Sequence, residues 1–217
     1  MRISPLSPER SAAGESLARA SGRTRSPALA RRWRTCALLA LACAAPGCQR
    51  SAPEAVATEF GIQIEGGDAF RAQVRDSLSL IDRHAPRELG EIARHVKRIK
   101  HDTRSGMAAY ENPPTFYLAD RSAFYSVTWC AGCIAHDAHH SKLYHDYLAA
   151  HGGQSVPDAV WSGQAAEQQC LKYQLTILES IGAPDDERVY VASCDGSHGD
   201  VNRDGKYDWR DDQQRNW

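Results

Sequence analysis

Apolar residues recur at every third or fourth position in four stretches of the chain, a spacing typical of amphipathic helices. One stretch begins at Asp68 and a second at Pro86, so two consecutive helices are predicted there. A longer helix is predicted from about Thr128 to Ala150, because two glycines follow it at once. A fourth helix is predicted from Ser162 to Ile181, where Gly182 and then Pro184 end the pattern.

Strands are indicated in fewer places. Residues 115–118 (Thr-Phe-Tyr-Leu) follow two prolines and precede an aspartate, which predicts a strand. The alternation over 189–191 (Val-Tyr-Val) predicts a short late strand. Residues 48–66 are polar, rich in Pro and Ala and end in glycine, a composition typical of a flexible tether. These patterns predict an α+β fold that is mostly helical and has a small β-sheet.

Charge is distributed unevenly along the 217 residues. Residues 1–47 contain eight arginines against two glutamates, whereas residues 48–217 contain 18 basic and 25 acidic side chains and all nine histidines. An acidic body argues against a nucleic-acid partner, because phosphate binding requires clustered Lys and Arg. No run of apolar residues approaches the roughly 20 that a transmembrane helix needs.

The basic start precedes an apolar run of ten residues, Cys36 to Ala45, and then small residues, a pattern typical of a secretory signal peptide. The segment Ala45-Pro46-Gly47-Cys48-Gln49 resembles a bacterial lipobox, in which Cys48 would receive the lipid. The resemblance implies export to the bacterial cell envelope, with the membrane contacted through a lipid anchor only. Exported proteins enter an oxidising compartment, so the four cysteines that follow Cys48 are expected to form disulfides, in one of three pairings. These are Cys130, Cys133, Cys170 and Cys194.

Five of the nine histidines lie between residues 136 and 151, along the long predicted helix and directly after its end. The sequence His136-Asp137-Ala138-His139-His140 places two histidines four residues apart, hence on one helical face. That spacing allows both imidazoles to bind one Zn²⁺ ion, and an acid beside the first histidine can take a proton from water at the metal. Glu167 lies in the early turns of the next predicted helix and is a candidate third ligand.

A two-histidine helix followed by a helix that bears Glu resembles the gluzincin class of zinc metallopeptidases. The resemblance implies that His136, His140 and Glu167 bind zinc and that Asp137 is the general base. It also implies that the strand at 115–118 is the sheet edge along which an extended peptide substrate aligns. The family usually has Glu at the position of Asp137, whose carboxylate is shorter by one methylene.

Two other interpretations use the same part of the chain. The doublet His136-Asp137 also resembles that of HD-domain phosphohydrolases, which would require an upstream ligand, His95 or His101, and a later aspartate, Asp146 or Asp158. The segment Trp129-Cys130-Ala131-Gly132-Cys133 resembles a thioredoxin-type redox site, in which a helix N-terminus makes a thiol more acidic.

The segment 200–211 (Asp-Val-Asn-Arg-Asp-Gly-Lys-Tyr-Asp-Trp-Arg-Asp) has the spacing of an EF-hand calcium loop, with Gly205 at its sixth position. The predicted calcium ligands are Asp200, Asn202, Asp204, the carbonyl of Lys206, Asp208 and Asp211. The last position is Asp in place of the usual Glu, and the loop resembles the single loops of dockerins. The expected Ca²⁺ ion is structural and not a regulatory switch, because this single loop has no second EF-hand with which to pair.

The sequence therefore divides into an N-terminal extension with signal peptide (1–47), a tether (48–66), a zincin-like metal-binding domain (67–199) and a calcium-loop segment (200–217). The predicted function is that of an exported, lipid-anchored, zinc-dependent hydrolase acting on a peptide or protein. The alternatives are a non-catalytic, calcium-stabilised surface lipoprotein and an HD-type metal phosphohydrolase.

Overall fold

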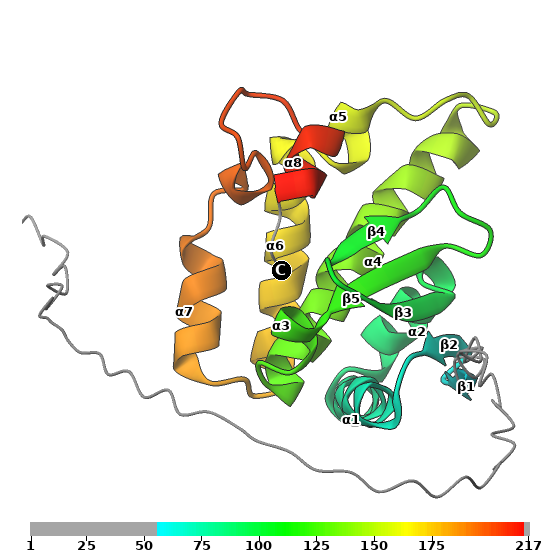
Figure 1. The fold of residues 1–217 in the computed structure, drawn as a ribbon, viewed down its shortest axis with the longest axis vertical. Coiled ribbons are helices and arrows are strands. Elements are labelled where there is room, and N and C mark those ends of the chain that lie inside the picture. The colour runs from blue at the N-terminus through cyan, green and yellow to red at the C-terminus, as the bar shows by residue number, and fades with distance from the viewer. Residues whose placement is uncertain (1–55, 215–217) are drawn as a thin grey trace, which may run out of the picture. The chain divides into compact units, whose positions relative to one another are not determined.

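The computed structural model describes residues 56–214, which belong to one compact unit (Figure 1). It confirms an α+β fold in which helices predominate around one small sheet. The strands are β1 (Val56–Glu59), β2 (Ile62–Glu65), β3 (Arg98–Asp102), β4 (Gly106–Ala108) and β5 (Thr115–Ala119). The helices are α1 (Asp68–His84), α2 (Pro86–His95), α3 (Asp120–Ala123), α4 (Val127–Ala150), α5 (Asp158–Trp161), α6 (Gln164–Ser180), α7 (Asp185–Ser193), the 3₁₀ helix η1 (Ser197–Gly199) and α8 (Trp209–Gln214).

The sheet has the order β1-β2-β3-β5-β4, with parallel pairs at its centre and antiparallel pairs at both sides. The strand predicted at 115–118 is β5, but it pairs on both sides and is not the edge predicted for substrate. The edge strands are β1 and β4, and the short β4 segment, Gly106–Ala108, is the edge next to β5.

Two segments have a different structure from the one predicted. The tether assigned to 48–66 contains the β1–β2 hairpin, because Ile62 and Ile64 alternate into the core and are fully buried. The strand predicted at 189–191 lies in helix α7, where acidic residues in the first turn favour a helix start. Its buried Glu187 accepts hydrogen bonds from Ser126 (2.6 Å) and Thr128 (2.8 Å), which fixes α7 against the start of α4.

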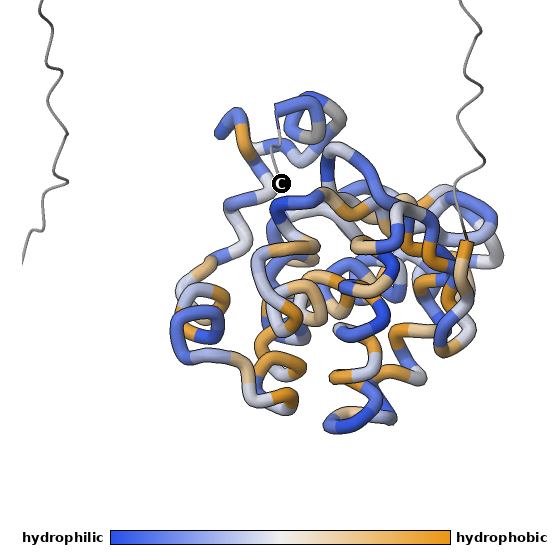
Figure 2. Tube along the Cα trace, turned by 60° about the horizontal axis from the view of Figure 1, so that its bottom comes forward, coloured by the Kyte–Doolittle hydropathy of each residue, from blue (hydrophilic) through white to orange (hydrophobic). Residues whose placement is uncertain are grey.

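The core forms where α4 packs against α1, α2 and α6 and against the sheet (Figure 1). Hydrophobic positions recur along each helix with hydrophilic ones between them, as Figure 2 shows. Ile134 on α4, Leu178 on α6 and Phe116 on β5 are fully buried. Helix α4 thus lies at the centre of the domain, and the side chains on its α6 side are held in place by packing.

Gly132 determines how closely α4 and α6 approach each other. A Cβ atom at this position would lie 2.9 Å from Leu178 Cδ2 and 3.3 Å from Gln174 Nε2, both on α6. The space around Gly90, inside α2, is by contrast open. The absence of a side chain at Gly132 therefore permits the close α4–α6 contact on which the histidine site depends.

Gly132→Val is expected to destabilise the domain by about 1–3 kcal/mol, because the added methyl groups overpack the α4–α6 contact. Gly90→Ala is expected to stabilise it by up to about 1 kcal/mol, since it lowers the entropy of the unfolded chain in an exposed helix. Helix propensity alone favours both substitutions. If urea unfolding shows that Gly132→Val lowers the free energy of unfolding while Gly90→Ala raises it, the difference is due to packing at Gly132. A gain in stability from Gly132→Val would contradict the close contact.

Candidate metal centre

The two histidines of the predicted motif and the predicted glutamate meet between α4 and α6. The Ser126 side chain caps the start of α4 by accepting a hydrogen bond from Trp129 N at 2.7 Å. Four turns of helix then hold His136 and His140 on the face toward α6. Glu167 lies in the first turn of α6 and is only 4% exposed.

The donor atoms of these three side chains lie at metal-ligand spacing. His136 Nε2 and His140 Nε2 are 3.0 Å apart. Glu167 Oε2 is 3.2 Å from His136 Nε2, and Glu167 Oε1 is 3.5 Å from His140 Nε2. Around a tetrahedral Zn²⁺ ion with bonds of about 2.0–2.1 Å, neighbouring ligand atoms are about 3.3–3.4 Å apart. The predicted zinc ligands are thus brought together with the separations that one small cation requires.

The outer nitrogens of both imidazoles are occupied by acceptors. His140 Nδ1 donates to the carbonyl oxygen of Trp161 at 2.5 Å, and His136 Nδ1 donates to Gln174 Oε1 at 3.1 Å. Each Nδ1 therefore carries a hydrogen, so that in a neutral ring Nε2 directs its lone pair toward the other ring. Partners of this kind orient metal-binding histidines in proteins. Two facing lone pairs repel unless a proton or a metal cation lies between them.

The electrostatics of the centre point to the same need for positive charge. Burial opposes the charged form of His140, but the neighbouring Cys170 and Glu167 outweigh it and hold its pKa well above the usual value. Burial likewise opposes the Glu167 carboxylate, yet the three surrounding imidazoles hold its pKa well below the usual value. A metal ion would take the place of the shared proton and release it on binding.

Two further side chains, which the sequence analysis did not assign to the zinc site, also lie at the centre. His198 Nε2, on η1, lies 3.3 Å from Glu167 Oε2. Cys170, one helical turn after Glu167, is buried, and its Sγ lies within 4.8 Å of a nitrogen of His136 and of His140. Cys170 could have been found from its i+3 spacing to Glu167. Nothing in the spacing along the chain connects His198 with α4 or α6.

Asp137, the predicted general base, is half-buried beside the centre. The pKa of Cys170 is raised mainly by burial, and the charge of Asp137 adds to the rise. Since Cys170 lies next to both imidazoles, the carboxylate of Asp137 acts electrostatically on the same region. The role of Asp137 as the general base stays a prediction from the sequence.

The remaining histidines of α4 point elsewhere. His139 packs against Tyr173, with ring centroids 5.1 Å apart, and burial is the main cause that lowers its pKa to about 4. His151 stacks on Tyr147 at the end of the helix.

The ligands required by the phosphohydrolase interpretation are also apart from the centre: within residues 56–214, the metal-ligand clusters include none of His95, His101, Asp146 and Asp158.

The thiols of the cysteine pair at the start of α4 are less acidic than usual, whereas a thioredoxin-type redox site needs a thiol that is more acidic. Cys130 and Cys133 are free thiols, as are Cys170 and Cys194, so the disulfides expected from export are not formed in the described part of the chain. Burial raises the pKa of Cys130 to about 11 and that of Cys133 well above its usual value. Buried thiols with raised pKa values are poor nucleophiles, and these two contribute to the core.

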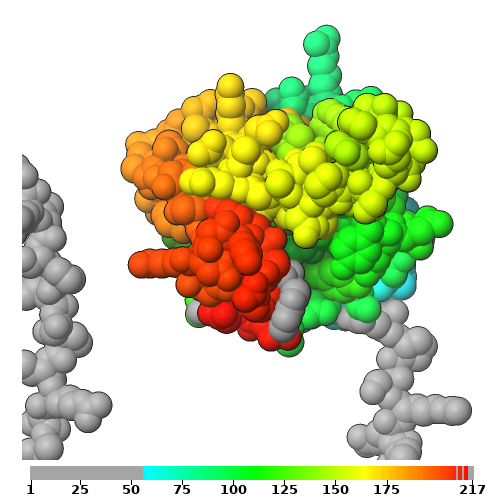
Figure 3. Space-filling model, turned by 90° about the horizontal axis from the view of Figure 1, so that it is seen from above, coloured from blue at the N-terminus to red at the C-terminus, as the bar shows by residue number. Residues whose placement is uncertain are grey.

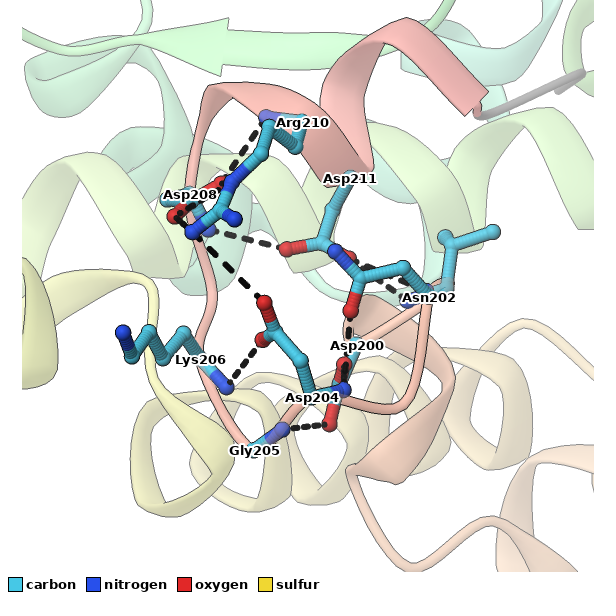
Figure 4. A network of polar contacts seen from close by, with 9 residues as sticks. Asp200, Asn202, Asp204, Gly205, Lys206, Asp208, Arg210 and Asp211 are labelled. Carbon is cyan, nitrogen blue, oxygen red and sulfur yellow. Dashed lines mark hydrogen bonds and ion pairs between the residues drawn. The ribbon is translucent and has the colours of Figure 1, made fainter.

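The predicted calcium loop folds into a compact turn between η1 and α8 (Figure 4). Gly205 has φ +80°, the left-handed conformation that the sixth position requires. Asp200 accepts hydrogen bonds from the backbone N–H groups of Asp204 (3.1 Å) and Gly205 (2.9 Å). Asp211, fully buried at the twelfth position, accepts from Val201 N at 2.8 Å and Asp208 N at 2.9 Å.

The loop carboxylates are turned toward protein donors. Asn202 Oδ1 accepts from Asp204 N at 2.8 Å, and Asp204 Oδ1 accepts from Lys206 N at 2.9 Å. The guanidinium of Arg210 binds Asp208 at 2.7 Å and lies 3.5 Å from Asp204 (Figure 4). Among the residues that the structure describes, no three carboxylates of the loop form a metal-ligand cluster. Calcium binding stays a prediction, and it would require a Ca²⁺ ion to displace Arg210.

The predicted lipidation site and the export signal lie outside the described residues. These are Cys48 and residues 1–47, so both stay predictions from the sequence. Within residues 56–214, no helix combines the length and apolar character needed to cross a membrane.

Comparison with known proteins leaves the geometry of the metal centre as the basis for assigning function. No family model, no curated protein and no solved structure matches the chain.

Proposed function

We propose that the protein is an exported zinc-dependent hydrolase that acts on peptides, with zinc bound by His136, His140 and Glu167. The observation that carries the proposal is the convergence of two imidazole Nε2 atoms and one carboxylate within 3.0–3.5 Å of one another. Each imidazole is oriented by an acceptor on its other nitrogen. Export is supported by the basic leader and by the lipobox resemblance around Cys48.

The residues present fit a zinc ion. Glu167 Oε2 is buried and has no hydrogen-bond partner among the described residues, although it faces two imidazoles. An unsatisfied buried carboxylate oxygen is costly, and a cation would remove that cost. Zinc, when bound, supplies a Lewis acid that polarises a carbonyl and makes water more acidic. In this proposal Asp137, the residue after His136, accepts the proton from the attacking water.

A peptide substrate is supported by the surroundings of the centre. Strand β4 leaves one edge unpaired, and an extended peptide can add to such an edge through main-chain hydrogen bonds. Tyr110, two residues beyond β4 and 67% exposed, packs edge-on against Trp161, whose carbonyl orients His140. These rings favour a peptide with a large apolar side chain next to the scissile bond.

The purified protein is expected to bind about one zinc ion per chain and to cleave peptides that contain large apolar residues. Removal of the metal by a chelator should abolish cleavage, and stoichiometric zinc should restore it. Metal analysis and hydrolysis of a mixed peptide library are the measurements. Substoichiometric zinc after equilibration with excess Zn²⁺ would overturn the metal site, and full zinc without cleavage would overturn the enzymatic part alone.

One observation favours a second candidate, a non-catalytic metal-binding surface protein. His198 Nε2 lies 3.3 Å from Glu167 Oε2, and a zinc site with four protein ligands is typically structural. On this hypothesis zinc would stabilise the fold, and no peptide would be cleaved at any zinc loading. The library measurement above separates the two candidates.

A further inference from the structure

His198 lies where a fourth ligand of the metal centre would be. Its Nε2 is 3.3 Å from Glu167 Oε2, and the same oxygen is 3.2 Å from His136 Nε2. Ligand atoms of His136, Glu167 and His198 all lie within 4.8 Å of one another. With His140, these side chains present three imidazoles and one carboxylate, a donor set well suited to Zn²⁺.

The Glu167 oxygen between the two imidazoles supports this arrangement independently. Glu167 Oε2 is buried, and His136 Nε2 and His198 Nε2 lie 3.2 and 3.3 Å from it. Ligand atoms of the three residues are close enough together for one cation to lie at a point between them. A cation at this point would contact the oxygen and both nitrogens together.

His198 is held at the centre by the C-terminal segment, defined here as residues 196–211. Tyr207 Oη donates to the carbonyl of Gly196 at 2.9 Å, and Gln168 Nε2, on α6, donates to the carbonyl of Asp195 at 2.9 Å. Figure 3 shows the segment, in orange-red to red, lying directly against the yellow surface of the α5–α6 region.

Gly199 allows the segment to lie this close to the metal centre. A Cβ atom there would be 2.9 Å from the Tyr207 ring and 3.1 Å from Glu167 Oε1. The buried Asp211 closes the loop behind it by binding the backbone at Val201 and Asp208 (Figure 4). The position of His198 thus depends on the folding of the whole C-terminal segment.

We propose that His198 is a fourth metal ligand, delivered by the C-terminal segment, so that metal binding and docking of this segment stabilise each other. The proposal rests on the proposed zinc site of His136, His140 and Glu167. By linkage, docking of the segment strengthens metal binding by the same factor by which bound metal strengthens docking of the segment. With four protein ligands the centre is closed, and release of His198 opens the position at which water or substrate binds.

The test compares full-length wild type with His198→Ala, and uses His151→Ala, on the far end of α4, as the matched control. Zinc affinity is measured by competition with a chromophoric chelator, and the number of bound imidazoles by X-ray absorption spectroscopy of the zinc-loaded protein. We expect three imidazoles in wild type and His151→Ala but two in His198→Ala, with zinc affinity at least about tenfold weaker in the latter.

A second variant tests the coupling without removing the imidazole. Gly196 has φ +85°, and a Cβ there would lie 2.8 Å from the carbonyl oxygen of Gln164, so Gly196→Ala must displace the turn that carries His198. Zinc is expected to slow proteolysis within 196–211 in wild type, and to do so much less in Gly196→Ala and His198→Ala. Circular dichroism confirms that each variant remains folded.

The outcomes separate this proposal from the zinc site itself. Unchanged affinity and imidazole count in His198→Ala, with zinc bound stoichiometrically, would overturn the role of His198 and leave the three-ligand centre intact. Absence of stoichiometric zinc in wild type would overturn the proposed function and this proposal with it. Zinc binding that leaves proteolysis of the segment unchanged would overturn the coupling.

Discussion

Asp137→Asn is expected to lower the rate of peptide hydrolysis by about 10²–10⁴-fold, the usual contribution of a general base. The amide is nearly isosteric with the carboxylate but cannot accept the proton of the attacking water. His136, His140 and Glu167 are unchanged, so the variant should still bind about one zinc ion. Initial rates on the best library peptide, normalised to measured zinc content, provide the comparison.

Two further substitutions on α4 control this experiment. Asp146→Asn removes an exposed carboxylate that pairs with Lys142, and it should leave the rate unchanged. Asp137→Glu restores the longer side chain usual in the gluzincins that the motif resembles, and activity should be retained or raised. A normal rate in zinc-loaded Asp137→Asn would exclude the carboxylate as the base.

His140→Ala is expected to weaken zinc binding by more than the roughly 10–100-fold that loss of an outer partner of a metal ligand costs. The imidazole is 6% exposed and bonded on both sides, to Trp161 through Nδ1 and toward His136 and Glu167 through Nε2. Its removal deletes one ligand and opens a polar cavity beside Glu167. Zinc content after dialysis against a weak chelator should fall from about one to near zero per chain.

His151→Ala is again the matched control, because this imidazole stacks on Tyr147 outside the centre. Removal of Glu167 provides a sharper distinction among interpretations. The zinc site proposed here loses its metal in Glu167→Ala, whereas a phosphohydrolase-type site would retain it. Equal zinc content in wild type and His140→Ala would show that the metal binds elsewhere.

The pattern of the sequence predicted the main helices because each buries a continuous apolar face. Helices α1, α2, α4 and α6 all lie where periodicity placed them, and β5 matches the strand at 115–118. The i, i+4 histidine spacing and a later helix that bears Glu were sufficient to predict which three side chains meet. Local periodicity is informative for these features since helices are defined by contacts near in sequence.

The missed strands depend on contacts distant in sequence. In β3, only Ile99 of five residues is buried, and the strand exists because it pairs in parallel with both β2 and β5. The β1–β2 hairpin did leave a local signal. Phe60 and Gly61 have φ values of 51° and 79°, a two-residue turn followed by the alternating Ile62 and Ile64. Phenylalanine is unusual at that turn position, and the composition of the segment resembled a tether.

The late helix and His198 could not be predicted for related reasons. Val189 and Tyr190 are 67% and 58% exposed, whereas Val191 is 2% exposed and packs in the core. The two valines therefore do not share one buried face, and α7 is held by Val191 and by the hydrogen bonds of Glu187. His198 lies in a short polar turn between two glycines. Only the tertiary fold brings this turn onto α6, so no periodicity could connect it with the histidine helix.

The proposed metal ligands lie far apart in the sequence, so a bound metal would also stabilise the fold. Glu167 follows His140 by 27 residues, and His198 follows Glu167 by 31. A cation joining them would hold these distant segments together in the folded state only, and such a ligand stabilises the fold by about 2.7 kcal/mol when its free concentration is about 100 times its Kd. Because the four described cysteines are free thiols, this domain would have a removable crosslink where exported domains commonly have permanent ones. The free zinc concentration around the protein would then determine how stably the C-terminal segment is docked.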